Sequence, residues 1–245
     1  MIDERFGLAG KVAAVIGGGG HLCSTLARAM AESGMRVAVL DIGEPPPSDL
    51  AYLRCDVTSK EALARCRDEI VARYGRVDVV LNGAGTNAPT PFFEITGEEI
   101  RRILDVHLVG LFFSCQVFGE TMVRQRSGSI INFASASSGP PLSKAFVYST
   151  AKAAVVSLTQ NLAREWATAN VRVNALRPGF FPTDWSMKHF IDKQREAKIL
   201  GHTPMARFGQ PDELVGAVLW LASDAASFVT GAVIAVDGGF TAMTI

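Results

Sequence analysis

The feature that most constrains the fold of this chain is a short apolar run that ends in four glycines. Val12–Ile16 is wholly apolar, and Gly17–Gly20 follows it directly. Such a run is typical of a buried parallel strand. Leu22–Ser33 then shows apolar residues at helical spacing and stops before Gly34. A strand, a glycine turn and a helix form a unit that binds dinucleotides, because glycine lets backbone N–H groups approach a pyrophosphate.

The remaining chain continues this alternation of apolar runs and helical patterns, without repeats or a linker. The other predicted strands are residues 36–40, 52–54, 77–81, 129–133, 171–176 and 233–236. The alternation indicates an α/β fold, a single-domain doubly wound parallel sheet of Rossmann type over residues 1–245, with helices on both faces. A ligand is then expected at the carboxyl ends of the strands.

Capping and breaking residues predict where helices begin and where they cannot form. Thr58 and Glu61 have the spacing of a capping box that opens a helix. Three consecutive prolines exclude a helix from Ile42–Asp49.

Tyr148 and Lys152 carry the clearest chemical signal. Phe146–Asn170 contains no Gly or Pro and predicts a helix, in which residues four apart share a face. A free Tyr has a pKa near ~10, and an ammonium one turn away favours the phenolate. Lowering the pKa to about 7 needs roughly 4 kcal/mol, to which a positively charged nicotinamide ring would add. Alone, the pair also fits two exposed helical residues.

Other motifs in the right order favour the chemical interpretation. Ser135 follows an apolar run, as does the turn Asn82–Gly85. With the glycine turn and Tyr-x-x-x-Lys, they resemble the short-chain dehydrogenase/reductase family over essentially the whole chain. The resemblance implies an NAD-dependent enzyme that interconverts a secondary alcohol and a ketone. Tyr148 would be the general acid/base, Lys152 would lower its pKa and bind the nicotinamide ribose, and Ser135 would hydrogen-bond the substrate oxygen.

The glycine turn departs from the family pattern Thr-Gly-x-x-x-Gly-x-Gly. Gly17 is kept, but His21 and Cys23 stand where the second and third glycines fall. In the turn Asn82–Gly85, Gly83 stands where the family prefers the second Asn of Asn-Asn-Ala-Gly. We expect Gly17, Gly20 and the backbone amides of His21 and Leu22 to approach the cofactor phosphates. The motif alone also fits a flexible loop.

Asp41, just after the second strand, bears on the choice of cofactor. A carboxylate there accepts hydrogen bonds from the adenosine ribose and repels a 2′-phosphate, and no Lys or Arg lies in the glycine turn. The sequence therefore favours NAD over NADP, although a solvated turn Asp is the alternative. The resemblance implies further cofactor contacts at Asp56, Val57, Asn82, Ala84, Gly85, Pro178, Gly179, Phe181 and Thr183. Of these, Asn82 is also expected to tie strand ends together.

His107 is a second departure, because the family usually has Asn there to help hold a water beside the Lys. His107 is either a proton-relay group, hence a candidate catalytic residue, or a helix histidine satisfied by a neighbour. Together with His21 and Cys23, it motivates an alternative function, a non-catalytic NAD(H)-binding regulator.

Residues 184–206 mix aromatic residues, Met and cations and predict a substrate lid. The lid carries Lys188, His189, Lys193, Arg195 and Lys198 against Asp192 and Glu196. This local excess of positive charge could attract a carboxylate, but paired charges on a solvated helix face fit equally well.

The turns of the chain bear on its substrate. The glycine turn, Asn82–Gly85 and the stretch 179–183 resemble the sugar-acid and polyol branch of the family, including mannonate and gluconate oxidoreductases. The aromatic residues Phe180, Phe181, Trp185 and Phe190 would equally wall a pocket for a more apolar ketone or a 3-oxoacyl thioester.

Composition limits the remaining classes. Lys+Arg 24 balance Asp+Glu 24 with no basic run, which disfavours nucleic-acid binding. The charged N-terminus lacks a signal-peptide core, and no apolar stretch is expected to approach the ~20 residues of a membrane span. Four cysteines without Cys-x-x-Cys spacing (Cys23, Cys55, Cys66, Cys115) disfavour zinc and disulfides and favour a cytoplasmic protein. The family resemblance implies a homotetramer.

Overall fold

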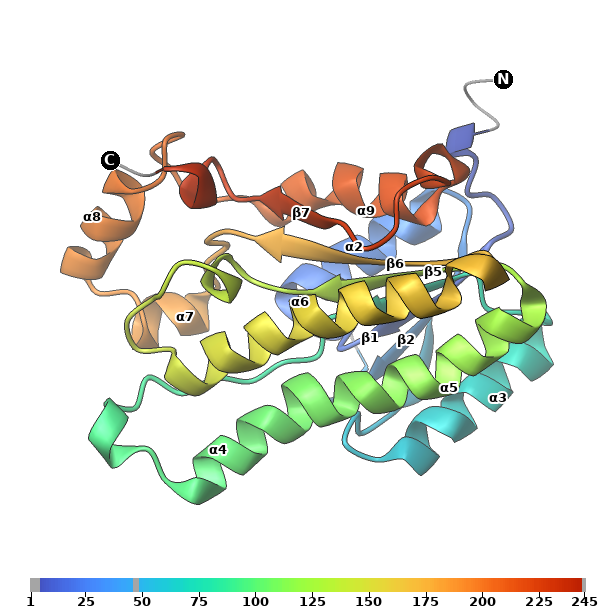
Figure 1. Cartoon of the computed structure of the whole chain (residues 1–245), viewed down its shortest axis with the longest axis horizontal. Coiled ribbons are helices and arrows are strands. Elements are labelled where there is room, and N and C mark those ends of the chain that lie inside the picture. Colours follow the sequence, from blue (N-terminus) through green and yellow to red (C-terminus); the bar gives the residue numbers. More distant parts are fainter. Residues whose placement is uncertain (1–4, 46–48, 244–245) are drawn as a thin grey trace.

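The computed structural model describes residues 5–45 and 49–243, without the side chains of Asp184, Trp185 and His189. In this part of the chain, seven parallel strands form one sheet in the order β3-β2-β1-β4-β5-β6-β7 (Figure 1). The strands are β1 (Val12–Ile16), β2 (Arg36–Asp41), β3 (Ala51–Arg54), β4 (Val79–Asn82), β5 (Gly128–Phe133), β6 (Val171–Pro178) and β7 (Val233–Val236). The predicted doubly wound parallel sheet is confirmed.

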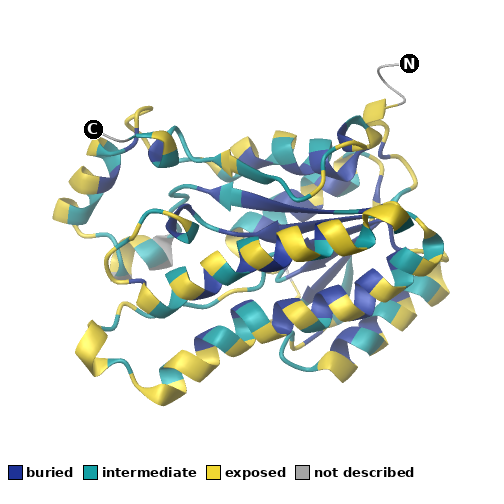
Figure 2. Cartoon of the chain, in the orientation of Figure 1, coloured by how far each residue is buried: buried dark blue, intermediate teal, exposed yellow. Residues whose placement is uncertain are grey.

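Helices cover both faces of this sheet. The helices of the described residues are α2 (His21–Glu32), α3 (Lys60–Tyr74), α4 (Gly97–Leu104), α5 (Gly110–Gln125), α6 (Phe146–Trp166), α7 (Asp184–His189), α8 (Lys193–Gly201) and α9 (Val215–Ala222). The buried side chains of α3, α5 and α6 pack in one cluster, and those of α2 and α9 pack in another. Side chains along a strand point alternately to the two faces of the sheet, and helices cover both faces. The strands β1 and β4 are therefore buried throughout their length (Figure 2).

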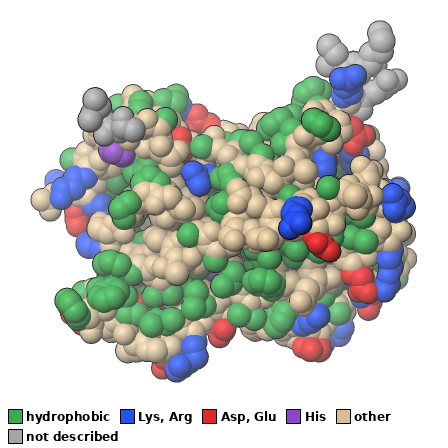
Figure 3. Space-filling model, viewed as in Figure 1, with side chains coloured by type: hydrophobic (Ala, Val, Ile, Leu, Met, Phe, Trp, Pro, Cys, Tyr) green, Lys and Arg blue, Asp and Glu red, His purple; other side chains and the backbone are tan. Residues whose placement is uncertain are grey.

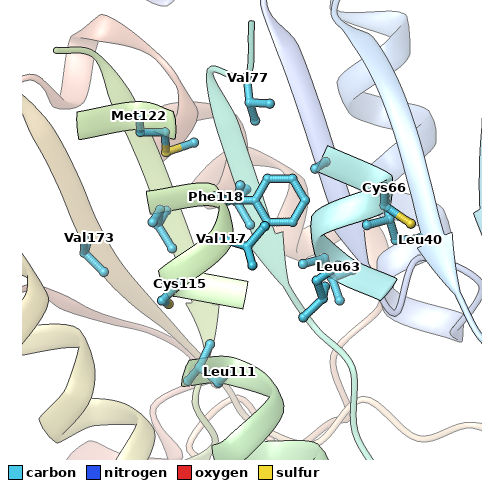
Figure 4. Close-up of a cluster of buried hydrophobic side chains, with 14 of the residues drawn as sticks. Leu40, Leu63, Cys66, Val77, Leu111, Cys115, Val117, Phe118, Met122 and Val173 are labelled. Atoms are coloured by element: carbon cyan, nitrogen blue, oxygen red, sulfur yellow. The ribbon is translucent and has the colours of Figure 1, made fainter. Parts of the chain in front are cut away.

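The larger core cluster is built around Phe118 of α5, which is fully buried. Figure 4 shows its ring pointing toward α3, where Leu63 and Cys66 lie. Gly119 lets α6 approach closely, since a β-carbon there would lie 2.4 Å from the ring of Trp166. These contacts fix α6, and with it the two residues of the Tyr-x-x-x-Lys motif, against the sheet.

A π-helical turn, Asp105–Val109, joins α4 to α5. The resulting stretch Gly97–Gln125 is long and apolar enough to cross a membrane by length and composition, so the expectation that no apolar run approaches a span is wrong. Half of its most apolar window is buried inside the protein. The contacts of α5 with α3 and the sheet account for this apolar character.

Two predicted boundaries differ in the structure. The cap of α3 is Ser59, whose Oγ accepts from the N–H of Ala62, while Thr58 donates to Asp56, so the helix begins one residue later than predicted. The strand predicted from residue 77 begins at Val79. A 3-10 turn, Pro211–Leu214, precedes α9. Residues 42–45 form no helix, as expected, and Pro46–Ser48 lie outside the described residues.

Candidate active site

A cavity of about 430 Å³ lies at the carboxyl ends of β4, β5 and β6. Its wall includes the four residues proposed from the sequence as catalytic, Ser135, Tyr148, Lys152 and His107. They come from the end of β5, from α6 and from the π-helical turn. Segments far apart in the chain therefore meet where a doubly wound sheet places its ligands.

Ser135 is oriented by the short 3-10 helix that follows it, Ala136–Ser138. The N–H and the hydroxyl of Ser137 both donate to Ser135 Oγ, each at 3.1 Å. Ser138 Oγ in turn accepts the backbone N–H of Ser135 at 3.0 Å. Two donors on the Ser135 oxygen direct its own hydrogen into the site, where it bonds Tyr148 in this structure and would bond a substrate oxygen when substrate is present.

Lys152 is 5% exposed, and its Nζ donates to the backbone carbonyl of Phe133 at 2.5 Å. Burial lowers its pKa to about 8, because a desolvated ammonium is destabilised. The Nζ lies 5.7 Å from the centroid of the Tyr148 ring. The carbonyl at the end of β5 thus holds the ammonium next to the tyrosine.

The pKa of Tyr148 departs from expectation in the protein without bound ligands. Burial raises it, and a hydrogen bond with Ser135 acts in the opposite direction. The sequence argument from Lys152 predicted a lowered pKa, and this direction is wrong for the free protein because desolvation disfavours the phenolate.

His107 lies in the π-helical turn and is 4% exposed. Its Nε2 meets the backbone of Thr86, 3.0 Å from the nitrogen and 2.6 Å from the oxygen, and its ring packs edge-on against Tyr148 at 5.1 Å. Burial and the charge of Lys152 lower its pKa to about 3, so the ring is neutral. Its Nδ1 is buried without a partner among the described residues. The backbone of Thr86 therefore satisfies Nε2 of the ring but not Nδ1.

A second, small cavity of about 20 Å³ lies between His107, Asn82 and Lys152. A cavity of this size holds one water when polar groups line it. This cavity lies beside Lys152, where the family resemblance implies a water.

Replacing His107 by Asn is expected to keep kcat/KM within tenfold of wild type, on the view that the backbone carbonyl of residue 107 positions the water. The measurement is steady-state kinetics with circular dichroism as the folding control. A loss beyond a hundredfold in a folded variant would instead assign the imidazole to proton transfer.

The same variant tests the buried, neutral state of the ring. Unfolded histidine binds a proton near pH 6.5, whereas His107 in the fold does so near 3, so wild-type stability falls as pH falls below 6.5. His107 accounts for a loss of about 1.5 kcal/mol between pH 6.5 and pH 5. The free energy of unfolding, measured in urea at both pH values, should not show this loss in His107→Asn.

The glycine turn fits the phosphates of a dinucleotide. Gly17 has φ 74°, and a β-carbon there would lie 2.5 Å from the nitrogen of Ala84. Gly20 is the N-cap of α2, whose first turn has no side-chain cap and no acidic residue. The amides of His21 and Leu22 in that first turn are therefore available to an anion.

Two departures from the family pattern meet below this turn. Cys23 is buried in α2, and a β-carbon on Gly83 would lie 2.1 Å from its Sγ. The thiol thus fills the space of a side chain at position 83. Burial raises its pKa to about 12, so it is a protonated, packed thiol.

Asp41 is the last residue of β2 and stands beside the glycine turn. Its Oδ2 accepts the N–H of Gly19, and its Oδ1 accepts the N–H of Gly43, both at 2.9 Å. Each carboxylate oxygen keeps a further lone pair for a ribose hydroxyl. Its location is the one expected for cofactor selection.

Asn82, Gly85 and Ala84, three of the other predicted cofactor residues, also have structural roles. Asn82 donates to Asn132 at 2.9 Å and accepts from Ser114 at 2.6 Å, which confirms that it ties strand ends together. Gly85 makes room for His107, because a β-carbon would lie 2.7 Å from the ring. Ala84 packs beneath Gly17.

Asp56 and Val57 lie just after β3. The exposed carboxylate of Asp56 accepts from the N–H and the hydroxyl of Thr58, at 2.9 and 2.7 Å, and so stabilises the turn before α3. Val57 packs against Gly110 of α5, where a β-carbon would lie 2.9 Å from its Cγ2. The structure does not bring either residue to the wall of the larger cavity.

The segment after β6 reaches the cavity. Pro178, Gly179 and Phe181 line it, and a β-carbon on Gly179 would lie 2.7 Å from Asp237. Thr183 caps α7 by accepting the N–H of Ser186 at 3.1 Å. The sequence argument missed this cap, which Ser186 three residues later could have indicated.

Comparisons with known proteins agree with this geometry. The family model described as enoyl-(acyl carrier protein) reductase matches residues 22–241. The chain is 34% identical to an NAD-dependent glycerol dehydrogenase of Listeria innocua, covering 98% of this chain and 97% of the relative. It is 37% identical to a galactitol 2-dehydrogenase of Cereibacter sphaeroides, covering 96% and 97%.

A solved structure is similar over the whole length. It is a gluconate 5-dehydrogenase of Burkholderia cenocepacia in complex with NADP and tartrate, 30% identical, with a TM-score of 0.93 and full coverage of both chains. By name, these proteins act on polyols or a sugar acid; the glycerol dehydrogenase is named as NAD-dependent, and the solved gluconate 5-dehydrogenase contains NADP.

Proposed function

Since this chain belongs to the short-chain dehydrogenase/reductase family and is an NAD(P)-dependent oxidoreductase, we propose that it acts on a sugar acid or polyol and prefers NAD. The observation that carries this proposal is the convergence of Ser135, Tyr148 and Lys152 on one cavity. The polyol and gluconate relatives support the substrate class.

In the proposed mechanism, Tyr148 accepts the proton of the substrate hydroxyl during oxidation and returns it during reduction. Ser135 donates a hydrogen bond to the same oxygen, and its orientation by Ser137 supports this role. Lys152 holds positive charge near the phenolate, opposing the burial that raises the pKa of Tyr148. His107 walls the site behind the tyrosine.

The residues present fit NAD. The first-turn amides of α2 would hold the diphosphate, Asp41 the adenosine ribose, and Lys152 the nicotinamide ribose. When bound, NAD supplies the hydride acceptor for the alcohol and adds positive charge near Tyr148.

A spectrophotometric screen tests the function. NADH formation is followed with polyols, sugar acids and hydroxysteroids, and NADH consumption with aryl ketones and 3-oxoacyl thioesters. We expect activity with polyhydroxylated substrates. The aromatic wall with Phe180, Phe181 and Phe190 favours the apolar substrates as the second candidate, and activity on those alone would reject the sugar assignment. NADH binding without any turnover would favour a regulator.

We further propose a cytoplasmic protein of one domain, with α7 and α8 as a substrate lid within residues 184–206. Ser186, Phe190 and Ile191 of this segment contribute to the cavity wall. In Figure 1, α7 and α8 lie beyond the ends of β5 and β6, which is where a lid over the site would lie.

We also propose a homotetramer, and exposed apolar side chains support it. Phe93 is 99% exposed, and Phe92 packs edge-on against Phe146 at 5.1 Å although both are exposed. Phe112 and Val109 are also exposed on the α5 side. Figure 3 shows hydrophobic side chains gathered on this face, and such patches mark interfaces.

Light scattering should give a tetramer with four times the mass of the 26.2 kDa chain. Replacing Phe93 by Asp should weaken assembly, while Phe228→Asp, at an exposed Phe outside this patch, serves as a comparison. A wild-type mass of one chain would contradict the proposal.

A further inference from the structure

Arg195 differs from the other cations of the lid segment. Lys188, Lys193 and Lys198 are exposed, and none lines the site cavity. Arg195, in the first turn of α8, does line it and is only partly exposed. Among the described cations of the lid segment, Arg195 is therefore the one that brings positive charge to the wall of the site cavity.

The guanidinium of Arg195 is held in place by the loop before the catalytic helix. Its Nη2 donates to the carbonyl of Ser143 at 2.8 Å, and its Nη1 to the hydroxyl of the same residue at 3.2 Å. Ser143 lies three residues before the start of α6, which carries Tyr148. Arginine has five N–H donors, so donors remain for a ligand in the cavity.

Arg195 forms no ion pair within 4 Å with an Asp or Glu among the described residues, and the only negative charge that acts on it there is that of Asp192. Asp192, the nearby acid, accepts the backbone N–H of Arg195 at 2.8 Å and lies 3.7 Å from Lys144. The described lining of the cavity contains no Asp or Glu, and its charged members are Lys152 and Arg195. Burial lowers the pKa of Arg195, which reflects partial loss of solvent. An anionic ligand would compensate a cation in this setting.

We propose that Arg195 binds the carboxylate of the substrate, so that the enzyme selects a sugar acid over the matching neutral polyol. The inference rests on the proposed function and narrows it. Ser135 and Tyr148 hold the reacting hydroxyl, and the arginine holds the acid group of the same molecule elsewhere in the cavity. The substrate class is thus a hydroxy acid with several hydroxyl groups.

The test compares sugar acids with their alditols, for example gluconate with glucitol and mannonate with mannitol. In Arg195→Gln, kcat/KM for the acid should fall about 10- to 100-fold, mainly through KM, as for the loss of a charged hydrogen bond. The value for the alditol should stay within twofold. Lys198→Gln, an exposed cation on the same helix, is the matched control and should change neither. Arg195→Lys should restore part of the acid activity.

A binding measurement separates this inference from the proposed function. Tartrate is titrated calorimetrically into the enzyme–NADH complex, and Arg195→Gln should abolish binding that Lys198→Gln retains. Equal losses for acid and alditol, or unchanged acid kinetics and tartrate binding, would overturn the role of Arg195 while leaving a polyol dehydrogenase. Inactivity of wild type on every acid and polyol would reject the proposed function itself, and the substrate selection with it.

Discussion

Replacing Tyr148 by Phe is expected to lower kcat by about 10²- to 10⁴-fold, because the variant lacks the hydroxyl that exchanges a proton with the substrate. NADH affinity should stay nearly unchanged, since Phe preserves the ring that packs edge-on against His107. Steady-state kinetics and fluorescence titration with NADH measure the two quantities.

The chain offers a matched control in Tyr74, a partly buried tyrosine at the end of α3. Tyr74→Phe should retain wild-type kcat, because it removes a hydroxyl far from the cavity. If Tyr148→Phe kept near-wild-type turnover, the mechanism proposed here would be wrong.

The wild-type enzyme should prefer NAD over NADP by more than tenfold in kcat/KM. Two backbone amides hold the carboxylate of Asp41 beside the glycine turn. A 2′-phosphate would bring negative charge next to this carboxylate, and the glycine turn contains no cation to offset it. Kinetics with both cofactors at fixed ionic strength give the ratio.

Asp41→Asn removes the negative charge at nearly constant volume and should reduce the ratio of kcat/KM for NAD to that for NADP. Glu44→Gln removes an exposed charge a few residues further along and should leave the ratio unchanged. Equal use of the two cofactors by wild type would refute the preference for NAD.

The sequence predicted the parts of this molecule that depend on local pattern. The apolar run Val12–Ile16 and its glycines indicated a buried strand and a turn, and the repeated alternation indicated the parallel sheet. Ser135 follows the end of β5, and the next helix, α6, begins near the same edge of the sheet with Tyr148 in its first turn, so the convergence of the two residues was also predictable.

Contacts between distant segments were not predictable. Arg195 is held by Ser143, 52 positions away, and no periodicity relates the two residues. His107 was ambiguous because its ring contacts Thr86 and Tyr148, which lie far from it in the sequence. The raised pKa of Tyr148 depends on how deeply the folded chain buries it, whereas the sequence argument weighed only the neighbouring charge.

The contact between Cys23 and Gly83 restricts the order in which these two positions could have diverged from the family pattern. The pattern has Gly at position 23 and Asn at position 83, and a β-carbon at 83 would lie 2.1 Å from the Cys23 sulfur. A chain with Cys at position 23 and Asn at position 83 would have a steric clash between the two side chains. A path on which Asn at position 83 is first replaced by Gly, and Gly at position 23 is then replaced by Cys, avoids this clash. Positions 23 and 83 are therefore epistatic. Gly83→Asn alone would bring a side chain against the Cys23 sulfur, whereas the same substitution together with Cys23→Gly would not.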